Sequence, residues 1–162
     1  KRSYQSGKSK VLGLRPNVAL VIINSEKKVL VGKRAGTQVW QLPQGGVESN
    51  TLIEAALREA QEELALSPSD LVPIDVLDYI NVYRFKTPKD YGDSVYSGQS
   101  QKFVVFKFVG RNVDVNLASS KELEEIDWID IEQLDLFCDP LRASAYKEVK
   151  EEIIRKKLLL RI

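Results

Sequence analysis

The chain contains no histidine and no methionine, and Cys138 is its single cysteine among 162 residues. Without histidine there can be no Ser-His-Asp triad, no zinc site built on imidazole and no histidine proton shuttle. One cysteine cannot form a disulfide within the chain, and no histidine is present to activate its thiol, so a cysteine nucleophile is also disfavoured. Acid–base catalysis is therefore left to carboxylates, lysines and tyrosines.

Long apolar runs are missing as well. No stretch approaches the roughly 20 residues that a membrane-spanning helix needs, and no signal-peptide pattern opens the sequence. Together with the lone cysteine, which suits a reducing compartment, this predicts a cytoplasmic protein without a membrane partner. The net charge of +1 creates no global field for nucleic acid, so we expect no DNA partner.

The composition is that of an ordinary globular chain, with 43% hydrophobic and 29% charged residues. Its length of 162 residues suffices for a sizeable core, so we predict a single domain over residues 1–162. The basic start, which also contains serine and glycine, predicts a flexible tail over residues 1–12. The sequence does not specify an oligomeric state.

The pattern of apolar residues predicts a mixture of strands and helices. A continuous apolar run at residues 17–24 is typical of a strand buried on both faces. Helices are predicted at about 51–64 and from 141 to about 159, and a polar loop at 86–100. Strands are predicted at residues 17–24, 28–34, 39–42, 75–85, 102–109 and 126–129. These elements predict an α/β fold in which helices sandwich a mixed sheet and a helix ends the chain.

The first predicted helix carries an unusual set of acidic residues. Glu59, Glu62 and Glu63 stand at positions i, i+3 and i+4, shortly after the flexible pair Gly45-Gly46. Counting about 100° per residue places the three carboxylates roughly opposite the apolar stripe, so we expect them to face outward together. Mg²⁺ takes carboxylates, waters and phosphate oxygens as ligands. The arrangement therefore predicts a site for Mg²⁺ that holds a polyphosphate, although a merely solvated acidic helix is the alternative.

The start of this helix is also marked in the sequence. Thr51 or Asn50 can cap its first N–H groups, and Glu54 completes a capping-box pattern with Thr51. Arg58 lies four residues before Glu62 and can neutralise one side of the acidic group.

Two segments carry a resemblance to a known family. Residues 40–48 read Trp-Gln-Leu-Pro-Gln-Gly-Gly-Val-Glu, and residues 58–63 read Arg-Glu-Ala-Gln-Glu-Glu. They resemble the Nudix hydrolases, whose motif is a Gly-rich loop followed by an Arg-Glu-x-x-Glu-Glu helix. The resemblance implies a Nudix-type α/β/α sandwich, hydrolysis of phosphoanhydride bonds, and Mg²⁺ as the cofactor, with Mn²⁺ as a substitute ion.

The resemblance also implies roles for individual residues. Glu59, Glu62 and Glu63 would bind the metal, and Glu59 or Glu63 would act as the catalytic base, with Glu122 open as an alternative. Arg58 would support catalysis as a salt-bridge partner. The backbone of Gly45 would lie at the metal, and that of Gly46 at the phosphates.

The sequence departs from the family pattern at two places. The segment from Gly45 to Arg58 is one residue short, and the glutamate expected near Asn50 is missing, which weakens the case for Glu48 as a metal ligand. Ala65 stands where the family has a glycine after the last glutamates.

Residues 15–18, 40–46 and 98–103 resemble, in this order, one branch of the family. That branch contains diadenosine tetraphosphate hydrolases and RNA pyrophosphohydrolases. It implies a late acidic residue that completes the metal shell. Glu122 occupies the matching place, while Glu124 and Glu125 stay open as alternatives.

The same resemblance implies a substrate site with cations and aromatic rings. Arg34 and Lys102 resemble phosphate contacts, while Lys33 is expected to face solvent. Gln44 would shape the phosphate site beside Gly46.

Tyrosines would hold the nucleoside end of the substrate. Tyr83 resembles an aromatic residue that supports the nucleotide. Tyr96 or Tyr91, both in the predicted polar loop, can stack on a base.

We therefore predict an Mg²⁺-dependent pyrophosphohydrolase that cleaves dinucleoside polyphosphates such as diadenosine tetraphosphate. The first alternative is removal of pyrophosphate from the 5′ end of triphosphorylated RNA, which the near-neutral net charge disfavours slightly. The second alternative, from another class, is a nucleotide-binding module that has lost hydrolysis.

Overall fold

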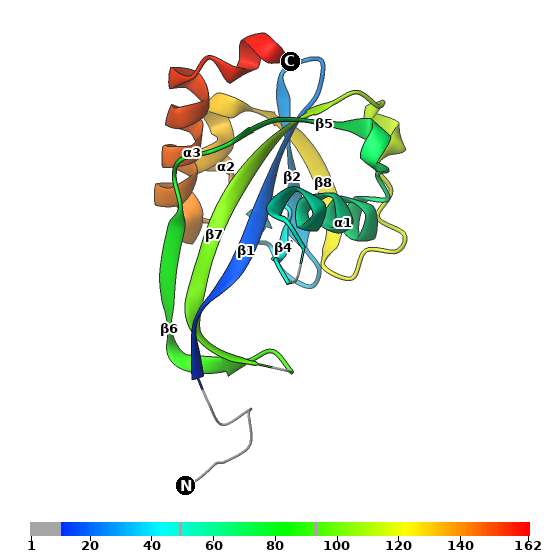
Figure 1. Cartoon of the computed structure of the whole chain (residues 1–162). Helices are drawn as coiled ribbons and strands as arrows, with labels where there is room; N and C mark the ends of the chain where they lie inside the picture. Colours follow the sequence, from blue (N-terminus) through cyan, green and yellow to red (C-terminus); the bar gives the residue numbers. More distant parts are fainter. Residues whose placement is uncertain (1–10, 49, 93) are drawn as a thin grey trace, which may run out of the picture.

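The computed structural model describes residues 11–48, 50–92 and 94–162, which form one sheet with helices on both faces (Figure 1). The strands are β1 (Val11–Ile23), β2 (Lys28–Arg34), β3 (Trp40–Gln41), β4 (Gln44–Gly46), β5 (Leu71–Val76), β6 (Asn81–Asp90), β7 (Val95–Phe108) and β8 (Leu123–Asp130). The α-helices are α1 (Leu52–Leu64), α2 (Leu134–Phe137) and α3 (Ala143–Arg155). Short 3-10 turns are η2 (Pro68–Asp70), η3 (Asn112–Asp114), η4 (Ile131–Gln133), η5 (Pro140–Arg142) and η6 (Leu158–Arg161).

The sheet is mixed and is organised around a long parallel pair. β1 and β7 pair in parallel from Val11 with Val95 to Ile23 with Lys107. β5 and β6 pair antiparallel with β7, and β2 lies on the other side of β1. β3 and β8 pair with β2, while β4 pairs antiparallel with β1. The predicted α/β fold with a mixed sheet and a C-terminal helix is confirmed.

Both faces of the central strands are covered. Side chains along β1 alternate between the faces, as the geometry of a strand requires. Ala19, Val21 and Ile23 pack in a core with Val149 and Ile153 of α3, and the intervening side chains pack in a second core against α1. In Figure 1, α1 lies over one face of the sheet while α2 and α3 cover the other. The strand buried on both faces, predicted from its apolar run, is confirmed.

Several predicted strand boundaries were wrong. The single strand predicted at 75–85 is two strands, β5 and β6, and most of the predicted polar loop at 86–100 belongs to β6 and β7. Residues 85–92 and 94–100, which include the ends of β6 and β7, form an arm that extends beyond the helices (Figure 1). Most β6 side chains in this arm are exposed. A strand without a buried face shows little hydrophobic alternation, which explains the failure of the sequence pattern. The short β4 after Pro43 was also missed.

The predicted tail at residues 1–12 is only partly covered by the structure. Residues 1–10 lie outside the described residues, whereas Val11 and Leu12 already belong to β1. Among the described residues, no helix is long and apolar enough to cross a membrane.

The single cysteine lies inside the core shared with α3. Cys138 is 4% exposed, and burial raises the pKa of its thiol to about 12. A thiol with such a pKa is protonated at neutral pH, so Cys138 serves as a packing residue, in line with the prediction that it is not a nucleophile.

Helix α1 begins with the predicted capping box. The Thr51 hydroxyl accepts the Glu54 N–H at 3.2 Å, and the Glu54 carboxylate accepts the Thr51 N–H at 3.0 Å. The helix ends at Ala65, whose φ of 58° lies in the left-handed region. This explains why the family favours glycine here, since a Cβ carries a steric penalty in that region.

Replacing Ala65 with glycine is expected to raise the free energy of unfolding by about 1 kcal/mol, because glycine adopts this conformation without the penalty. Chemical denaturation measures the change. The matched control is Ala118→Gly, at an exposed loop position without a positive φ, where we expect no gain. Equal effects at the two positions would contradict the argument.

Candidate functional site

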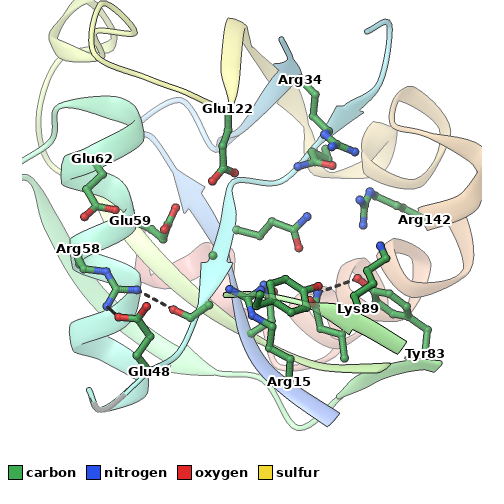
Figure 2. Close-up of a pocket in the computed structure, with 17 residues that line it drawn as sticks. Arg15, Arg34, Glu48, Arg58, Glu59, Glu62, Tyr83, Lys89, Glu122 and Arg142 are labelled. Atoms are coloured by element: carbon green, nitrogen blue, oxygen red, sulfur yellow. Dashed lines mark hydrogen bonds and ion pairs between the residues drawn. The ribbon is translucent and has the colours of Figure 1, made fainter. Parts of the chain in front are cut away.

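A group of three carboxylates lies between α1 and the start of β8. Glu59, Glu63 and Glu122 each offer an oxygen, and these oxygens lie within 4.8 Å of one another. Glu59 and Glu63 are each 7% exposed, whereas Glu122 lies at the surface. Glu62, on the exposed side of α1, points toward the same pocket but stands outside this close group (Figure 2).

The expectation that these carboxylates face outward together was wrong for two of them. The angular count places Glu59 and Glu63 away from the apolar stripe, but β4 and the chain before β8 cover that side of α1. Burial by neighbouring segments leaves no trace in the periodicity of the helix itself. Glu59 and Glu63 therefore lie in a covered site, whereas Glu62 and Glu122 are exposed at its edge.

Glu63 is held by the chain segment that leads into β8. Its Oε1 accepts hydrogen bonds from the Ser120 hydroxyl and from the N–H of Glu122, the latter at 3.1 Å. The Ser120 oxygen in turn accepts the Leu123 N–H at 3.0 Å. These contacts position Glu122 beside α1.

The site concentrates negative charge away from water. Burial raises the pKa of Glu59 to about 7, and the negative charges of Glu122, Glu63 and Glu62 add to the effect. The pKa of Glu122 is also raised, first by burial and then by the charge of Glu63. Oε2 of Glu59 is buried without a hydrogen-bond partner among the described residues.

This donor set fits a divalent cation. An unpaired buried carboxylate oxygen is costly, and crowded like charges add to the cost. A hard cation with oxygen ligands would relieve both. The described residues thus contain an acidic cluster that can hold a divalent metal, with Glu59, Glu63 and Glu122 as its ligands.

The glycine pair of β4 runs between the carboxylates and a cationic side chain. A Cβ on Gly45 would collide with the carboxylate of Glu59, and one on Gly46 would collide with the guanidinium of Arg15. Both glycines pair with β1, Gly46 opposite Asn17, which restrains this backbone. The close approach favours glycine at both positions, because a Cβ would displace the charged end of Glu59 or of Arg15.

Gly45→Ala is therefore expected to displace Glu59 and to lower the free energy of unfolding by about 1–3 kcal/mol through overpacking. It should also weaken binding of divalent ions, which isothermal titration measures. Gly13→Ala is the control, because a Cβ at Gly13 would meet nothing within 4 Å. An unchanged affinity in the Gly45 variant would contradict the proposed packing.

Arg58 holds the end of β4 and the segment that follows it through hydrogen bonds. Its Nη2 donates to the Gly46 carbonyl at 2.7 Å, and its Nη1 donates to the Asn50 Oδ1 at 2.6 Å. Glu48 lies 3.6 Å from the same guanidinium. The glutamate that the family pattern has near Asn50 is missing, and Asn50 itself accepts a hydrogen bond from Arg58. The geometry gives Arg58 a positioning role.

A pocket of about 540 Å³ lies next to the carboxylates, and its two sides carry opposite charges. Glu59, Glu62 and Glu122 lie on one side, and Figure 2 shows basic side chains across from them. The basic residues that line this pocket are Arg15, Arg34, Arg58, Lys89 and Arg142. We call it the first pocket. A space that is acidic at one end and basic at the other suits a metal ion together with phosphates.

Hydrogen bonds among amide side chains and one tyrosine hold part of the lining of the first pocket in place. The Gln101 Nε2 donates to the Asn17 Oδ1 at 2.7 Å and also to the Gln44 Oε1, which fixes Gln44 at the rim. The Gln99 Nε2 donates to the Tyr83 hydroxyl at 2.7 Å. Gln44 and Tyr83, for which the resemblance implies a phosphate site and a nucleoside support, both line the pocket.

Other predicted residues lie elsewhere among the described residues. Lys102 lines a separate pocket with Leu52 and Val47, and Tyr96 lines a neighbouring pocket described below. Lys33 forms an ion pair with Glu124 at 3.2 Å. Glu122 is thus the member of its acidic run that joins the carboxylate group, whereas Glu124 is engaged elsewhere.

Sequence reasoning missed Lys89 and Arg142 and gave no role to the side chain of Arg15. Arg15 lies in a segment that carried the family resemblance, which was a usable signal. Lys89 belongs to the arm and Arg142 to η5, and nothing in the local sequence of either indicates a place in the pocket. Tyr91, named as an alternative to Tyr96, does line the first pocket.

Comparison with curated proteins shows near full-length relatives. An RNA pyrophosphohydrolase of Rickettsia bellii is 34% identical over 152 residues, which covers 91% of this chain and 94% of the relative. An RNA pyrophosphohydrolase of Pelagibacter ubique is 32% identical over 151 residues, covering 88% and 92%.

Solved structures share the fold at lower identity. A C. elegans Ap4A hydrolase in a binary complex has a TM-score of 0.59 and 21% identity, covering 90% of this chain and 98% of that one. The E. coli dihydroneopterin triphosphate pyrophosphohydrolase has a TM-score of 0.63 and 19% identity, covering 86% and 97%. The family model described as NUDIX domain matches residues 13–155. The chain belongs to the Nudix family, and the prediction of a hydrolase that acts on phosphoanhydride bonds is confirmed.

Proposed function

We propose that the protein is an Mg²⁺-dependent RNA pyrophosphohydrolase, which converts 5′-triphosphorylated RNA to 5′-monophosphorylated RNA and pyrophosphate. This reverses the order of the sequence-based predictions, which placed dinucleoside polyphosphates first. The relatives at 32–34% identity support the change, because both are named RNA pyrophosphohydrolases. The observation that carries the proposal is the first pocket, where basic side chains face a carboxylate group.

The local charge distribution answers the objection from net charge. A net charge of +1 disfavours RNA only if the charge is spread evenly. Here Arg15, Arg34, Lys89 and Arg142 converge on one pocket, so a phosphate chain meets a concentrated positive field. Arg34 and Arg142 can each offer a planar guanidinium to phosphate oxygens.

The chain's own residues have distinct tasks in this reaction. Glu59, Glu63 and Glu122 would hold Mg²⁺, which when bound supplies Lewis-acid stabilisation of charge on phosphate oxygens. Glu59 or Glu63 accepts a proton from the attacking water as that water's oxygen bonds to phosphorus. The bond from this phosphorus to the bridging oxygen breaks, and pyrophosphate leaves. The basic side chains hold the phosphates in line with the carboxylates.

A second candidate is hydrolysis of diadenosine tetraphosphate. It needs the same carboxylates and basic residues, and the Tyr83 hydroxyl held by Gln99 at 2.7 Å is suited to support a nucleoside. The third prediction, a binding module without hydrolysis, loses support because the complete carboxylate group is present.

A competition between substrates tests the proposal. The purified chain with Mg²⁺ is expected to release pyrophosphate from a 5′-triphosphorylated oligonucleotide with a kcat/KM at least about tenfold above that for diadenosine tetraphosphate. A chelator should abolish both activities, and Mn²⁺ should restore them. The reverse preference would overturn the RNA assignment in favour of the second candidate. Inactivity on both substrates would overturn the shared mechanism.

A further inference from the structure

A second pocket of about 610 Å³ opens beside the first. Its lining comes from β1, the loop after β4 and the arm, and consists of Arg15, Pro16, Gly46, Val47, Glu48, Tyr91 and Tyr96. Arg15, Gly46, Glu48 and Tyr91 line both pockets, so the two spaces adjoin along these residues. A chain-like ligand can therefore pass from one pocket to the other.

Arg15 stands at the boundary between the pockets. Its guanidinium lies 4.3 Å from the ring centroid of Tyr91 and so close to Gly46 that a Cβ there would collide with it. A guanidinium that already rests on an aromatic ring loses little conformational freedom when it binds an anion. This placement suits a phosphate at the junction of the pockets.

The second pocket is bounded by aromatic rings of the arm. The rings of Tyr91 and Tyr96 meet edge to face with centroids 5.8 Å apart, and Phe85 lies 6.5 Å from Tyr91. Tyr91 is 38% exposed, so its ring is accessible. The Nζ of Lys89 lies 4.5 Å from the centroid of the Phe85 ring. Lys89 also lines the first pocket, so it places a positive charge between the arm and that pocket. Aromatic rings beside cations, here with Tyr91 exposed and Tyr96 and Phe85 partly buried, are typical of surfaces that bind single-stranded nucleic acid.

The one acidic residue of the second pocket is exposed and has a cationic partner. Glu48 lies 3.6 Å from the Arg58 guanidinium, and its side chain is 77% exposed, so solvent screens its charge. Pro16 and Val47 supply apolar surface. The lining thus combines two rings, apolar groups and a single available cation, which matches a nucleobase followed by one phosphate.

We propose that the second pocket binds a nucleobase of the RNA that lies 3′ of the nucleotides held in the first pocket. The base stacks on the ring of Tyr96 and meets the Tyr91 ring at an angle, because the two rings are inclined at 68°. Arg15 binds the phosphate that joins the two parts of the RNA. This inference rests on the proposed function and extends it, because it makes longer single-stranded RNA a better substrate than a dinucleotide. Stacking tolerates any base, so the preference concerns length and not sequence.

Tyr96 is the diagnostic residue because it lines only the second of these pockets. The test compares kcat/KM for a 5′-triphosphorylated dinucleotide and an unstructured 5′-triphosphorylated pentanucleotide. The wild-type chain should favour the pentanucleotide about tenfold, and Tyr96→Ala should reduce this ratio to about one. Tyr96→Phe should keep the ratio, since stacking needs the ring and not the hydroxyl. Val113→Ala, at a position that is 78% exposed and outside both pockets, is the control and should also keep it.

Each other outcome overturns the proposal in a distinct way. A wild-type chain without length preference, which needs no variant, overturns it directly. A ratio unchanged in Tyr96→Ala excludes the tyrosine. An equal loss for the dinucleotide, the pentanucleotide and diadenosine tetraphosphate would instead place a nucleoside of short substrates in this pocket. Absence of cleavage of every RNA would refute the proposed function, and this inference with it.

Discussion

Glu59→Gln is expected to lower kcat by about 10²–10⁴-fold while making the metal-free protein more stable. The glutamine keeps the shape of the side chain but removes the negative charge that a metal ligand or a base requires. In the metal-free protein the same charge is a burden, because burial and the neighbouring carboxylates raise the pKa of Glu59 to about 7. At a pH of about 8 the variant should therefore gain about 1 kcal/mol or more in free energy of unfolding.

The opposite signs of the two effects make the experiment specific. Single-turnover kinetics measures the loss of activity, and denaturation in the presence of a chelator measures the gain in stability. Glu151→Gln is the matched control, since Glu151 is exposed on α3 and neither quantity should change. A variant that lost activity and stability together would indicate general damage to the fold and would count against a metal-binding role of Glu59.

The stability of the metal-free protein is expected to fall as the pH rises through the range between 4.5 and about 7, the ordinary and the raised pKa of Glu59. In this range the unfolded chain has lost the proton of Glu59 while the folded chain retains it, so a rise in pH favours unfolding. The full effect is about 3 kcal/mol, or about 6–12 °C in Tm. Carboxylates with a lowered pKa, such as Glu152, act in the opposite direction at lower pH.

Mg²⁺ should reverse this trend. The ion binds the deprotonated carboxylates, so its stabilising effect should be larger at a pH of about 8 than at about 5.5. Thermal melts with Mg²⁺ and with a chelator at both pH values measure the difference. Glu59→Gln should flatten the pH dependence of the metal-free melts. An Mg²⁺-induced shift in Tm that is the same at both pH values would contradict the assignment of Glu59 to the metal site.

The carboxylate helix could be predicted from sequence because its signals are local. Thr51 and Glu54 mark the start of α1, and the spacing of Glu59 and Glu63 places both side chains on adjacent turns. What surrounds the helix is not local. The contact of Glu63 with Ser120 joins residues 57 positions apart, so burial of the carboxylates could not be deduced from the helix alone.

Lys102 lies apart from the first pocket for a different reason. Its neighbour Gln101 lies on the face of β7 that is turned toward the first pocket. There its side chain donates hydrogen bonds to Asn17 and Gln44. Adjacent residues of a strand point to opposite faces, so Lys102 must face the side of α1. This could have been deduced from strand alternation. By contrast, the presence of Lys89 and Arg142 in the pocket follows from the course of the arm and of η5, which the sequence pattern does not show.

The parallel pairing of β1 with β7 has a consequence for the synthesis of the chain. Asn17 and Gln101, which pair across these strands, are 84 positions apart, and the apolar residues of β1 find their main partner only when β7 has been made. Until then the nascent chain exposes the continuous apolar run Val18–Ile23, which is buried in the folded protein. We expect a ribosome-stalled chain that ends before residue 102 to be retained by chaperones, and release to follow once β7 emerges.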